Sequence, residues 1–165
     1  MKYSLKKQLL TESMGYIDEH PFFAALRNYV DTAEGDYDSA YITIEGSDGC
    51  MAQAYLGIDE DPQGIWIDKI EVVKTDTKEM HPECFRKGYA KAMLQALTKA
   101  ADETGTHLAL IAASEAYYKR RYPHIHFPDK DQLAALYAQY GFVEEYSNYA
   151  QVKICLLYTS DAADD

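Results

Sequence analysis

The sequence lacks the features of a membrane protein and of a disulfide-rich protein. No apolar run approaches the roughly 20 residues that cross a bilayer, and the lysines among the first ten residues are not followed by the apolar segment of a signal peptide. Only three cysteines occur in 165 residues, namely Cys50, Cys84 and Cys155. An odd number of widely spaced cysteines is typical of a reducing compartment rather than of a disulfide framework. We therefore expect a cytoplasmic protein with no membrane partner.

Basic residues are also scarce. The chain has 16 Lys and Arg against 27 Asp and Glu, a net charge of −11. A nucleic-acid surface needs concentrated positive charge, so we expect no nucleic-acid partner. An acidic surface attracts a cationic small molecule or a basic peptide instead, although acidity at this level more commonly serves solubility alone.

Two common nucleotide-binding motifs, Gly-x4-Gly-Lys-Ser/Thr and Gly-x-Gly-x2-Gly, are absent, which argues against kinases and Rossmann enzymes. What the chain has instead is a short basic turn that contains Gly88 and runs directly into a helical pattern. Apolar residues then recur with the spacing of one buried helical face, at Ala90, Met93, Leu94, Leu97 and Ala101. Such a turn is often only a solvated first turn. Placed after a strand, however, its N–H groups and the positive end of the helix dipole suit a phosphate or pyrophosphate.

The hydrophobic pattern predicts one α/β domain around this turn. In chain order it predicts a helix over 21–32, strands over 39–45 and 50–58 joined by a hairpin turn, a strand over 65–73, a helix ending at Gly105, a strand over 106–113, a helix over 131–140, and strands over 142–145 and 149–154. The order strand, helix, strand makes 65–73 and 106–113 parallel neighbours. Residues 1–14 suit either a short helix or an edge strand, and 115–130 is predicted to be irregular.

The domain is predicted to span residues 1–154, a length that buries one substantial core. The last residues, 155–165, resemble the translated adapter read-through that ends many environmental gene fragments. We therefore treat 155–165 as a non-native tail and expect the native sequence after Ile154 to be missing.

Two motifs, Phe85-Arg86-Lys87-Gly88-Tyr89-Ala90 and the segment Leu136 to Phe142, together resemble those of the GNAT superfamily of acyl-CoA-dependent N-acetyltransferases. The first, Phe85-Arg86-Lys87-Gly88-Tyr89-Ala90, is similar to the family's pyrophosphate loop, Gln/Arg-x-x-Gly-x-Gly/Ala, with Phe85 in place of Gln or Arg. The second, Leu136 to Phe142, is similar to its Leu-Tyr-x-x-x-Gly-Phe segment. The motifs cover about 65–143. The resemblance implies an α/β (α+β) fold, with a central mixed, mostly antiparallel sheet, a parallel central strand pair and flanking helices.

The resemblance also implies the activity: direct transfer of an acetyl group from acetyl-CoA, the co-substrate, to a primary amine of a small molecule, peptide or protein. The residues implied to bind the co-substrate are Val72, Val73, Phe85, Arg86, Lys87, Gly88, Tyr89, Ala90 and Lys91. Tyr137 matches the family's tyrosine that protonates or hydrogen-bonds the CoA sulfur. It also shares a helical stripe with Leu133 and Tyr140, where a tyrosine is commonly a core residue.

The base for the amine proton has two main candidates, Asp68 and Glu71. They are three positions apart, so a regular strand turns them to opposite faces and at most one faces the acceptor. A water chain is the alternative, and Ser114 and Glu115 are further candidates.

The long segment after the second parallel strand is rich in aromatic and histidine side chains. We expect an acceptor pocket lined by Tyr117, Tyr118, Tyr122, His124 and His126. His81 and Cys84, in the long segment between the 65–73 strand and the glycine turn, provide ligand types that suit zinc together with these histidines. Their spacing is not a recognised zinc pattern, and we predict no metal.

Two other functions remain open at this point. The same fold binds acyl-CoA as a non-catalytic sensor or scaffold if the base is absent. An acidic decoy of nucleic acid is a third class, but it predicts carboxylates clustered without the interspersed Lys and Arg of this chain. The sequence leaves the acceptor undefined and leaves a homodimer open.

Overall fold

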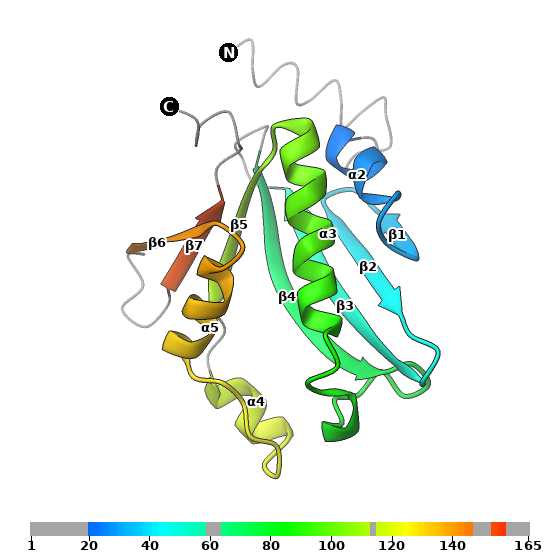
Figure 1. Cartoon of the computed structure of the whole chain (residues 1–165), viewed down its shortest axis with the longest axis vertical. Coiled ribbons are helices and arrows are strands. Elements are labelled where there is room, and N and C mark those ends of the chain that lie inside the picture. Colours follow the sequence, from blue (N-terminus) through cyan, green and yellow to red (C-terminus); the bar gives the residue numbers. More distant parts are fainter. Residues whose placement is uncertain (1–19, 59–63, 113–114, 147–152, 158–165) are drawn as a thin grey trace.

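The computed structural model describes residues 20–58, 64–112, 115–146 and 153–157; for 111, 112, 115–117, 144–146 and 153–157 it describes the backbone only. Its described strands form a seven-stranded sheet of order β1-β2-β3-β4-β5-β7-β6 (Figure 1). The strands are β1 Thr32–Gly35, β2 Ser39–Glu45, β3 Cys50–Ile58, β4 Gly64–Lys74, β5 His107–Ala112, β6 Phe142–Tyr146 and β7 Lys153–Leu157. Neighbours are antiparallel except β4 and β5, which are parallel. The predicted mixed, mostly antiparallel sheet with a parallel central pair is confirmed.

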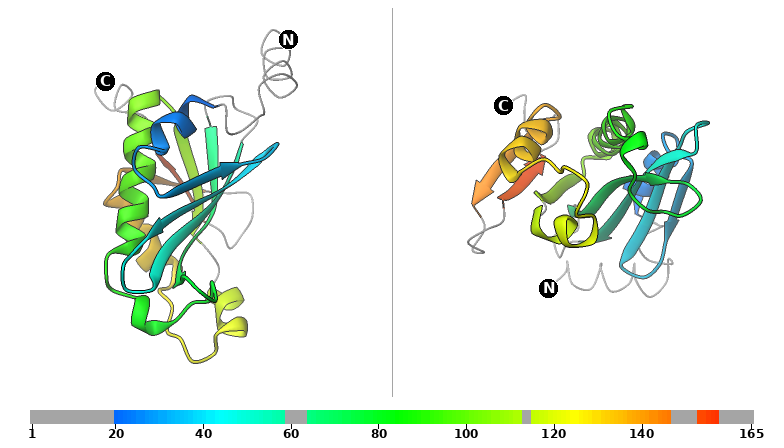
Figure 2. Two further views of the ribbon diagram at one scale, coloured as in Figure 1. Left: turned by 90° about the vertical axis from the view of Figure 1, so that its right-hand side faces the viewer. Right: turned by 90° about the horizontal axis from the view of Figure 1, so that it is seen from below.

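The helices are α2 Pro21–Leu26, α3 Tyr89–Thr104, α4 Glu115–Arg121 and α5 Lys130–Ala138, with a 3-10 turn, η2, at Pro82–Cys84. Helices α3 and α5 lie on the same face of the sheet, and α4 lies beyond one end of it (Figure 2). Within the residues described, no helix combines the length and the apolar character needed to cross a membrane.

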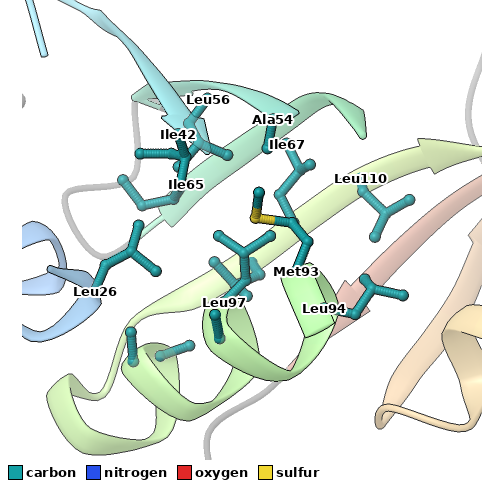
Figure 3. Packing of buried hydrophobic residues seen from close by; sticks show 14 of the residues in the cluster. Leu26, Ile42, Ala54, Leu56, Ile65, Ile67, Met93, Leu94, Leu97 and Leu110 are labelled. Atoms are coloured by element: carbon teal, nitrogen blue, oxygen red, sulfur yellow. The ribbon is translucent and has the colours of Figure 1, made fainter. Parts of the chain in front are cut away.

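The core lies between α3 and the central strands. Met93, Leu94 and Leu97 of α3 pack against apolar side chains of β2, β3, β4 and β5 (Figure 3). Each large apolar side chain buried in this way contributes about 1.5–3 kcal/mol to folding. The helix ends where predicted, because Gly105 takes the left-handed conformation, with φ 67°, and its N–H donates to the carbonyl of Ala101. The core therefore fixes the position of the segment that begins α3.

The predicted helix over 21–32 is wrong in its second half. Helix α2 ends at Leu26, and Thr32–Gly35 forms the edge strand β1 beside β2. The N–H of Asp31 donates to the carbonyl of Thr43 at 2.9 Å, and its carboxylate accepts the N–H of Glu45 at 2.6 Å. Hydrogen bonds to a strand distant in sequence thus outweigh the local helical pattern.

Two further segments differ from the expectation. The stretch 115–130, predicted to be irregular, begins with helix α4, whose last turn carries Lys119, Arg120 and Arg121, and positive charge favours a helix C-terminus. The last strand is Lys153–Leu157 rather than 149–154, so it includes three residues that we assigned to the tail. Residues 1–14 lie outside the described part of the chain.

The cysteines also correct the sequence analysis, because Cys50 and Cys84 form a disulfide. Cys50 begins β3, and Cys84 ends η2. The fold brings these segments together, with the two Cα atoms 5.5 Å apart across a sequence separation of 34. A count and a spacing in sequence do not report this tertiary contact. The cysteine pattern therefore does not support the expected reducing compartment.

Replacing both cysteines, as Cys50→Ala with Cys84→Ala, is expected to lower the free energy of unfolding by about 3–4 kcal/mol. The bond closes a loop of 34 residues, and that loop entropy returns to the unfolded chain when the bond is absent. Urea unfolding with and without a thiol reductant measures the effect. Reductant must lower the midpoint of the wild type and leave that of the double variant unchanged; an unchanged wild type contradicts the prediction.

Candidate functional site

Strands β4 and β5 part in the middle of the sheet. Their parallel pairing joins Gly64–Ile67 to His107–Leu110 and stops there. Strand β4 continues to Lys74 along β3, while β5 pairs with β7 on its other side. From Asp68 onward the other edge of β4 therefore has no strand partner in the described part of the chain. We call this gap between the two strands the opening.

A β-bulge in β4 coincides with the start of the opening. Lys69 pairs with Tyr55 and Ile67 pairs with Leu56, so Asp68 is the extra residue between them. A bulge bends its strand and redirects the side chain it carries. It also explains why the alternation of a regular strand does not describe residues 68–71.

A cavity of about 530 Å³ occupies the opening. It is bounded by β4 and β5, by the segment before α3, by α4 and by α5. Its lining residues are Ile67, Asp68, Lys69, Ile70, Val72, Met80, Phe85, Arg86, Ala90, Leu110, Tyr118, His126, Phe127, Pro128, Gln132, Leu133, Leu136 and Tyr137. Most of these side chains are apolar, and a few polar groups lie among them, which is the usual composition of a small-molecule site.

The segment Phe85–Ala90, which we call the phosphate loop after the family motif that it resembles, contributes Phe85, Arg86 and Ala90 to the wall of the cavity. Arg86 and Gly88 both have left-handed backbones, with φ 63° and 88°. Gly88 is the N-cap of α3, and its carbonyl accepts the N–H of Ala92 at 2.9 Å. For a residue with a side chain such as Arg86 this conformation is uncommon and is associated with functional sites. Left-handed residues before a helix make N–H groups converge, as an anion requires.

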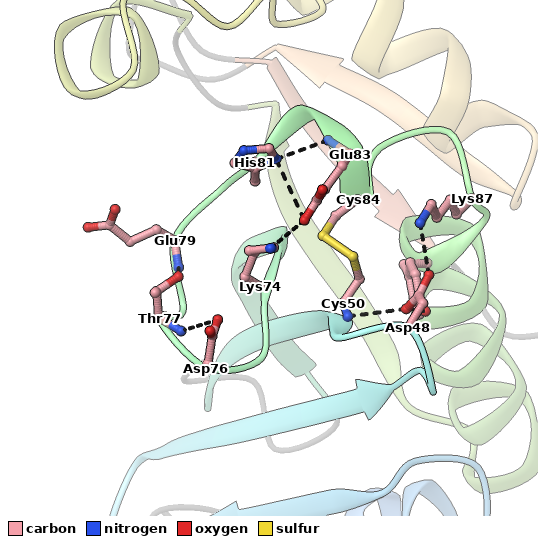
Figure 4. Close-up of a disulfide and its surroundings, with 11 residues drawn as sticks. Asp48, Cys50, Lys74, Asp76, Thr77, Glu79, His81, Glu83, Cys84 and Lys87 are labelled. Carbon is pink, nitrogen blue, oxygen red and sulfur yellow. Dashed lines mark hydrogen bonds and ion pairs between the residues drawn. A yellow bond between two sulfur atoms is a disulfide. The ribbon is translucent and has the colours of Figure 1, made fainter.

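The β2–β3 turn, Gly46–Gly49, contacts the phosphate loop through Asp48 (Figure 4). Its carboxylate accepts a hydrogen bond from the Tyr89 hydroxyl at 2.5 Å and binds Lys87 Nζ at 3.0 Å. Together with the N–H of Cys50, and with the Tyr89 hydroxyl as the largest cause, these contacts lower the pKa of Asp48 from its usual 3.8 to about 2. The loop is thus held to a hairpin distant from it in sequence.

The lowered pKa predicts how stability depends on pH. Because the pKa of Asp48 in the folded state, about 2, lies below its usual 3.8, the unfolded chain takes up this proton first as the pH falls. The contribution is therefore present above pH 3.8 and is lost as the pH falls towards 2. In urea titrations over this range, the wild type is expected to lose stability more steeply than Asp48→Asn. Parallel pH profiles of the two proteins contradict the prediction.

Tyr137, on α5, also lines the cavity. A reciprocal cap fixes the start of this helix: the N–H of Gln132 donates to Asp129 Oδ1 at 2.8 Å, and the N–H of Asp129 donates to Gln132 Oε1 at 2.9 Å. Tyr137 is 9% exposed as a residue, and its ring lies 6.1 Å from the ring of Phe142, centroid to centroid. Tyr137 is therefore both a core residue and a residue of the cavity.

The structure separates the two candidate bases. Asp68 lines the cavity, and its Oδ2 lies 3.7 Å from the position that a Cβ on Gly57 would take. Partial burial raises the pKa of Asp68, and neighbouring Lys69 opposes this shift. Glu71 is absent from the cavity wall and accepts a hydrogen bond from Gln53 at 2.9 Å. Ser114 and the side chain of Glu115 lie outside the description.

The predicted acceptor residues are only partly brought together. Tyr118 and His126 line the cavity, whereas His124 is exposed outside it. Tyr122 supports the wall from behind, because its hydroxyl accepts the N–H of Met80 at 3.4 Å and its ring packs near Phe127. The side chain of Tyr117 is not described.

The predicted co-substrate residues divide in a similar way. Those on the cavity wall are Val72, Phe85, Arg86 and Ala90. Lys87 and Tyr89 bind Asp48 instead, and Gly88 supplies the left-handed turn. Val73 is buried and Lys91 is exposed, and neither lines the cavity.

Sequence reasoning missed the apolar part of the wall. Phe127, whose ring stacks on that of Tyr118 with the centroids 5.0 Å apart, was not singled out, nor was Gln132, a polar residue of the same wall. Leu133 was noted only as part of a helical stripe, and that stripe on α5 was the available signal. Nothing in the sequence marks the bulge at Asp68.

For a metal, the described residues offer no group of three or more His, Cys, Asp or Glu side chains. Cys84, considered beside the histidines as a zinc ligand, is bonded to Cys50.

The mixed sheet, its parting parallel pair and the glycine turn that enters α3 form the architecture that the two sequence motifs imply. The fold is GNAT-like.

No protein-family model and no curated protein sequence matches the chain. Among solved structures, the chain is similar to nourseothricin acetyltransferase, at 18% identity and a TM-score of 0.46 over 73% of this chain and 65% of that one. It thus spans slightly less than two thirds of that protein. It is also similar to an acetyltransferase from Bacillus subtilis in complex with CoA, at 16% identity and a TM-score of 0.46 over 73% and 77%.

Proposed function

We propose that this chain transfers an acetyl group from acetyl-CoA to a primary amine. The observation that carries the proposal is the opening between β4 and β5. One cavity there joins the phosphate loop, a strand edge that has no partner strand among the described residues, the Tyr137 side chain and the Asp68 carboxylate. These are the four kinds of group that direct acyl transfer from a thioester to an amine requires.

The shape of the opening suits the parts of acetyl-CoA. An extended pantetheine arm carries amide groups that can hydrogen-bond along the edge of β4 as an added strand would. The pyrophosphate then reaches the phosphate loop, where Arg86 adds a positive charge to the N–H groups at the start of α3. The apolar walls at Ile70, Val72 and Leu136 exclude water from the thioester.

In the reaction, the amine nitrogen forms a bond to the acetyl carbon, and the carbon–sulfur bond breaks. Asp68 receives the proton that the amine loses, directly or through water, and burial favours this by raising its pKa. Tyr137 supplies a proton or a hydrogen bond to the departing sulfur. The main-chain N–H groups of β4 in the opening stabilise the negative charge that develops on the carbonyl oxygen.

The acceptor end of the cavity favours an amine attached to an apolar or aromatic group. Tyr118 and Phe127 form a stacked aromatic pair on the cavity wall, which also carries His126 and the Asp68 carboxylate. Aromatic faces and a carboxylate both attract a cation. The net charge of −11 acts in the same direction over longer distances.

The test is an acceptor screen with release of the CoA thiol as the readout. Small aliphatic amines, aromatic amines and lysine-containing peptides are each mixed with acetyl-CoA and the purified protein. Amine-dependent thiol release, with acetylated product identified by mass spectrometry, supports the proposal. Binding of acetyl-CoA without release for any amine would favour the non-catalytic acyl-CoA sensor.

The two carboxylates on β4 give a sharper test of the mechanism. Asp68→Asn is expected to lower kcat by about 10²-fold, the lower limit of what a general base contributes. Glu71→Gln, which makes the same change three residues away and off the cavity wall, is expected to leave kcat nearly unchanged. Steady-state kinetics with a saturating amine measures both. Equal losses in the two variants would remove Asp68 from the role of base.

A further inference from the structure

The β2–β3 turn and the residue that follows it are joined to the phosphate loop and to the residue that precedes it by several contacts. Asp48 binds both Lys87 and Tyr89, and Cys50, directly after the turn, is bonded to Cys84, directly before the loop. Two polar contacts and one covalent bond therefore hold the loop from both of its ends (Figure 4).

The turn is also shaped to receive Tyr89. A Cβ on Gly46 would lie 1.6 Å from the Tyr89 hydroxyl oxygen and 2.6 Å from the ring carbon that carries it. Any side chain at this position would displace the ring and break its hydrogen bond to Asp48. The absence of a side chain at Gly46 is therefore a condition for the contact.

These contacts place the two basic residues of the loop, Lys87 and Arg86, in different surroundings. Lys87 is paired with Asp48 and points into the turn, so its charge is largely neutralised there. Arg86, held in a left-handed conformation, lines the cavity and makes no ion pair with any other described residue. The charge available to a phosphate in the cavity is thus that of Arg86.

We propose that Asp48 is a positioning residue, which, through Lys87 and Tyr89, holds the phosphate loop in the conformation that receives a pyrophosphate. This inference rests on the proposed function, because it assigns the loop to the pyrophosphate of acetyl-CoA. Asp48 itself does not line the cavity.

Three variants remove the contact in different ways: Asp48→Asn, Tyr89→Phe and Gly46→Ala. The last keeps both partners and only displaces the ring. Two controls make the same chemical changes away from the loop. Asp102→Asn changes an exposed aspartate on α3, and Tyr37→Phe changes a tyrosine that is 53% exposed. All variants keep the disulfide between Cys50 and Cys84, and circular dichroism checks that each folds like the wild type.

The first measurement needs no ligand. Trypsin cleaves after Arg86 and Lys87, both exposed, and cleavage requires the loop to leave its conformation. Each of the three variants is expected to be cleaved there about threefold to tenfold faster than the wild type, the effect of one lost hydrogen bond. Unchanged cleavage rates in the three variants would overturn the inference.

The second measurement uses acetyl-CoA and S-acetylpantetheine, which lacks the pyrophosphate; neither carries a free thiol that could open the disulfide. The variants are expected to weaken acetyl-CoA binding about threefold to tenfold and to leave S-acetylpantetheine binding as in the wild type. Equal changes for both ligands, or none, would overturn the positioning role. Failure of wild-type protein to bind acetyl-CoA would instead refute the proposed function, while the trypsin result would still stand.

Discussion

Replacing Tyr137 with phenylalanine is expected to lower kcat for acetyl transfer by about 10²-fold, because general acid catalysis contributes at least this much. The substitution removes only the hydroxyl. The ring keeps its packing against Phe142 and its place on the cavity wall, so the protein should fold as before. The KM for acetyl-CoA should change by less than about twofold, since the lost interaction acts mainly in the transition state.

A matched control is available in the same segment. Tyr140→Phe removes a tyrosine hydroxyl three residues further on, at a position that does not line the cavity. It should leave kcat and KM unchanged. If Tyr137→Phe and Tyr140→Phe behave alike, Tyr137 is only a core residue and the proposed mechanism loses its acid.

Ala90→Asp is expected to abolish acetyl-CoA binding without destabilising the fold. Ala90 lies in the first turn of α3 and on the cavity wall. A carboxylate in the first turn of a helix is favourable by about 0.3–1 kcal/mol. The same charge repels a pyrophosphate in the loop: two like charges about 4 Å apart near a protein surface cost roughly 4 kcal/mol. Stability and binding therefore change in opposite directions, which general damage to the fold does not produce.

Thermal unfolding with and without acetyl-CoA tests this variant. A ligand at 100 times its Kd stabilises the wild type by about 2.7 kcal/mol, and Ala90→Asp should show no such shift. Gln95→Glu makes the same change in net charge on the exposed side of α3 and should retain the shift. A normal shift in Ala90→Asp would place the pyrophosphate elsewhere.

The central fold could be predicted from the sequence because local and tertiary signals agree there. The apolar stripe of α3 places Met93, Leu94, Leu97 and Ala101 in the core, and the apolar runs that become β2 to β5 contribute to the same core. The errors arose where tertiary contacts overrule local pattern. The carboxylate of Asp31 accepts a hydrogen bond from the N–H of Glu45 in β2, next to the edge strand β1, and Cys50 forms a disulfide with Cys84, which is distant in sequence.

The site was predictable as a set of motifs but not as a geometry. The glycine turn and the Leu136 to Phe142 segment marked two walls of the cavity, and Asp68 was one of two equivalent carboxylates. Only the bulge at Asp68 and the end of the β4–β5 pairing after Ile67 distinguish it from Glu71. Lys87, which sequence reasoning assigned to the pyrophosphate, pairs with Asp48 because of a hairpin some 40 residues earlier.

Calorimetric titration of the wild-type protein with acetyl-CoA shows whether the cavity between β4 and β5 is a site for the co-substrate. Running it at two temperatures about 15 °C apart guards against a binding enthalpy near zero, because burial of apolar surface makes that enthalpy temperature-dependent. We expect one site per chain with a Kd of about 1 to 100 μM, within the usual range for enzyme substrates. Absence of heat at both temperatures from a protein folded by circular dichroism would contradict it.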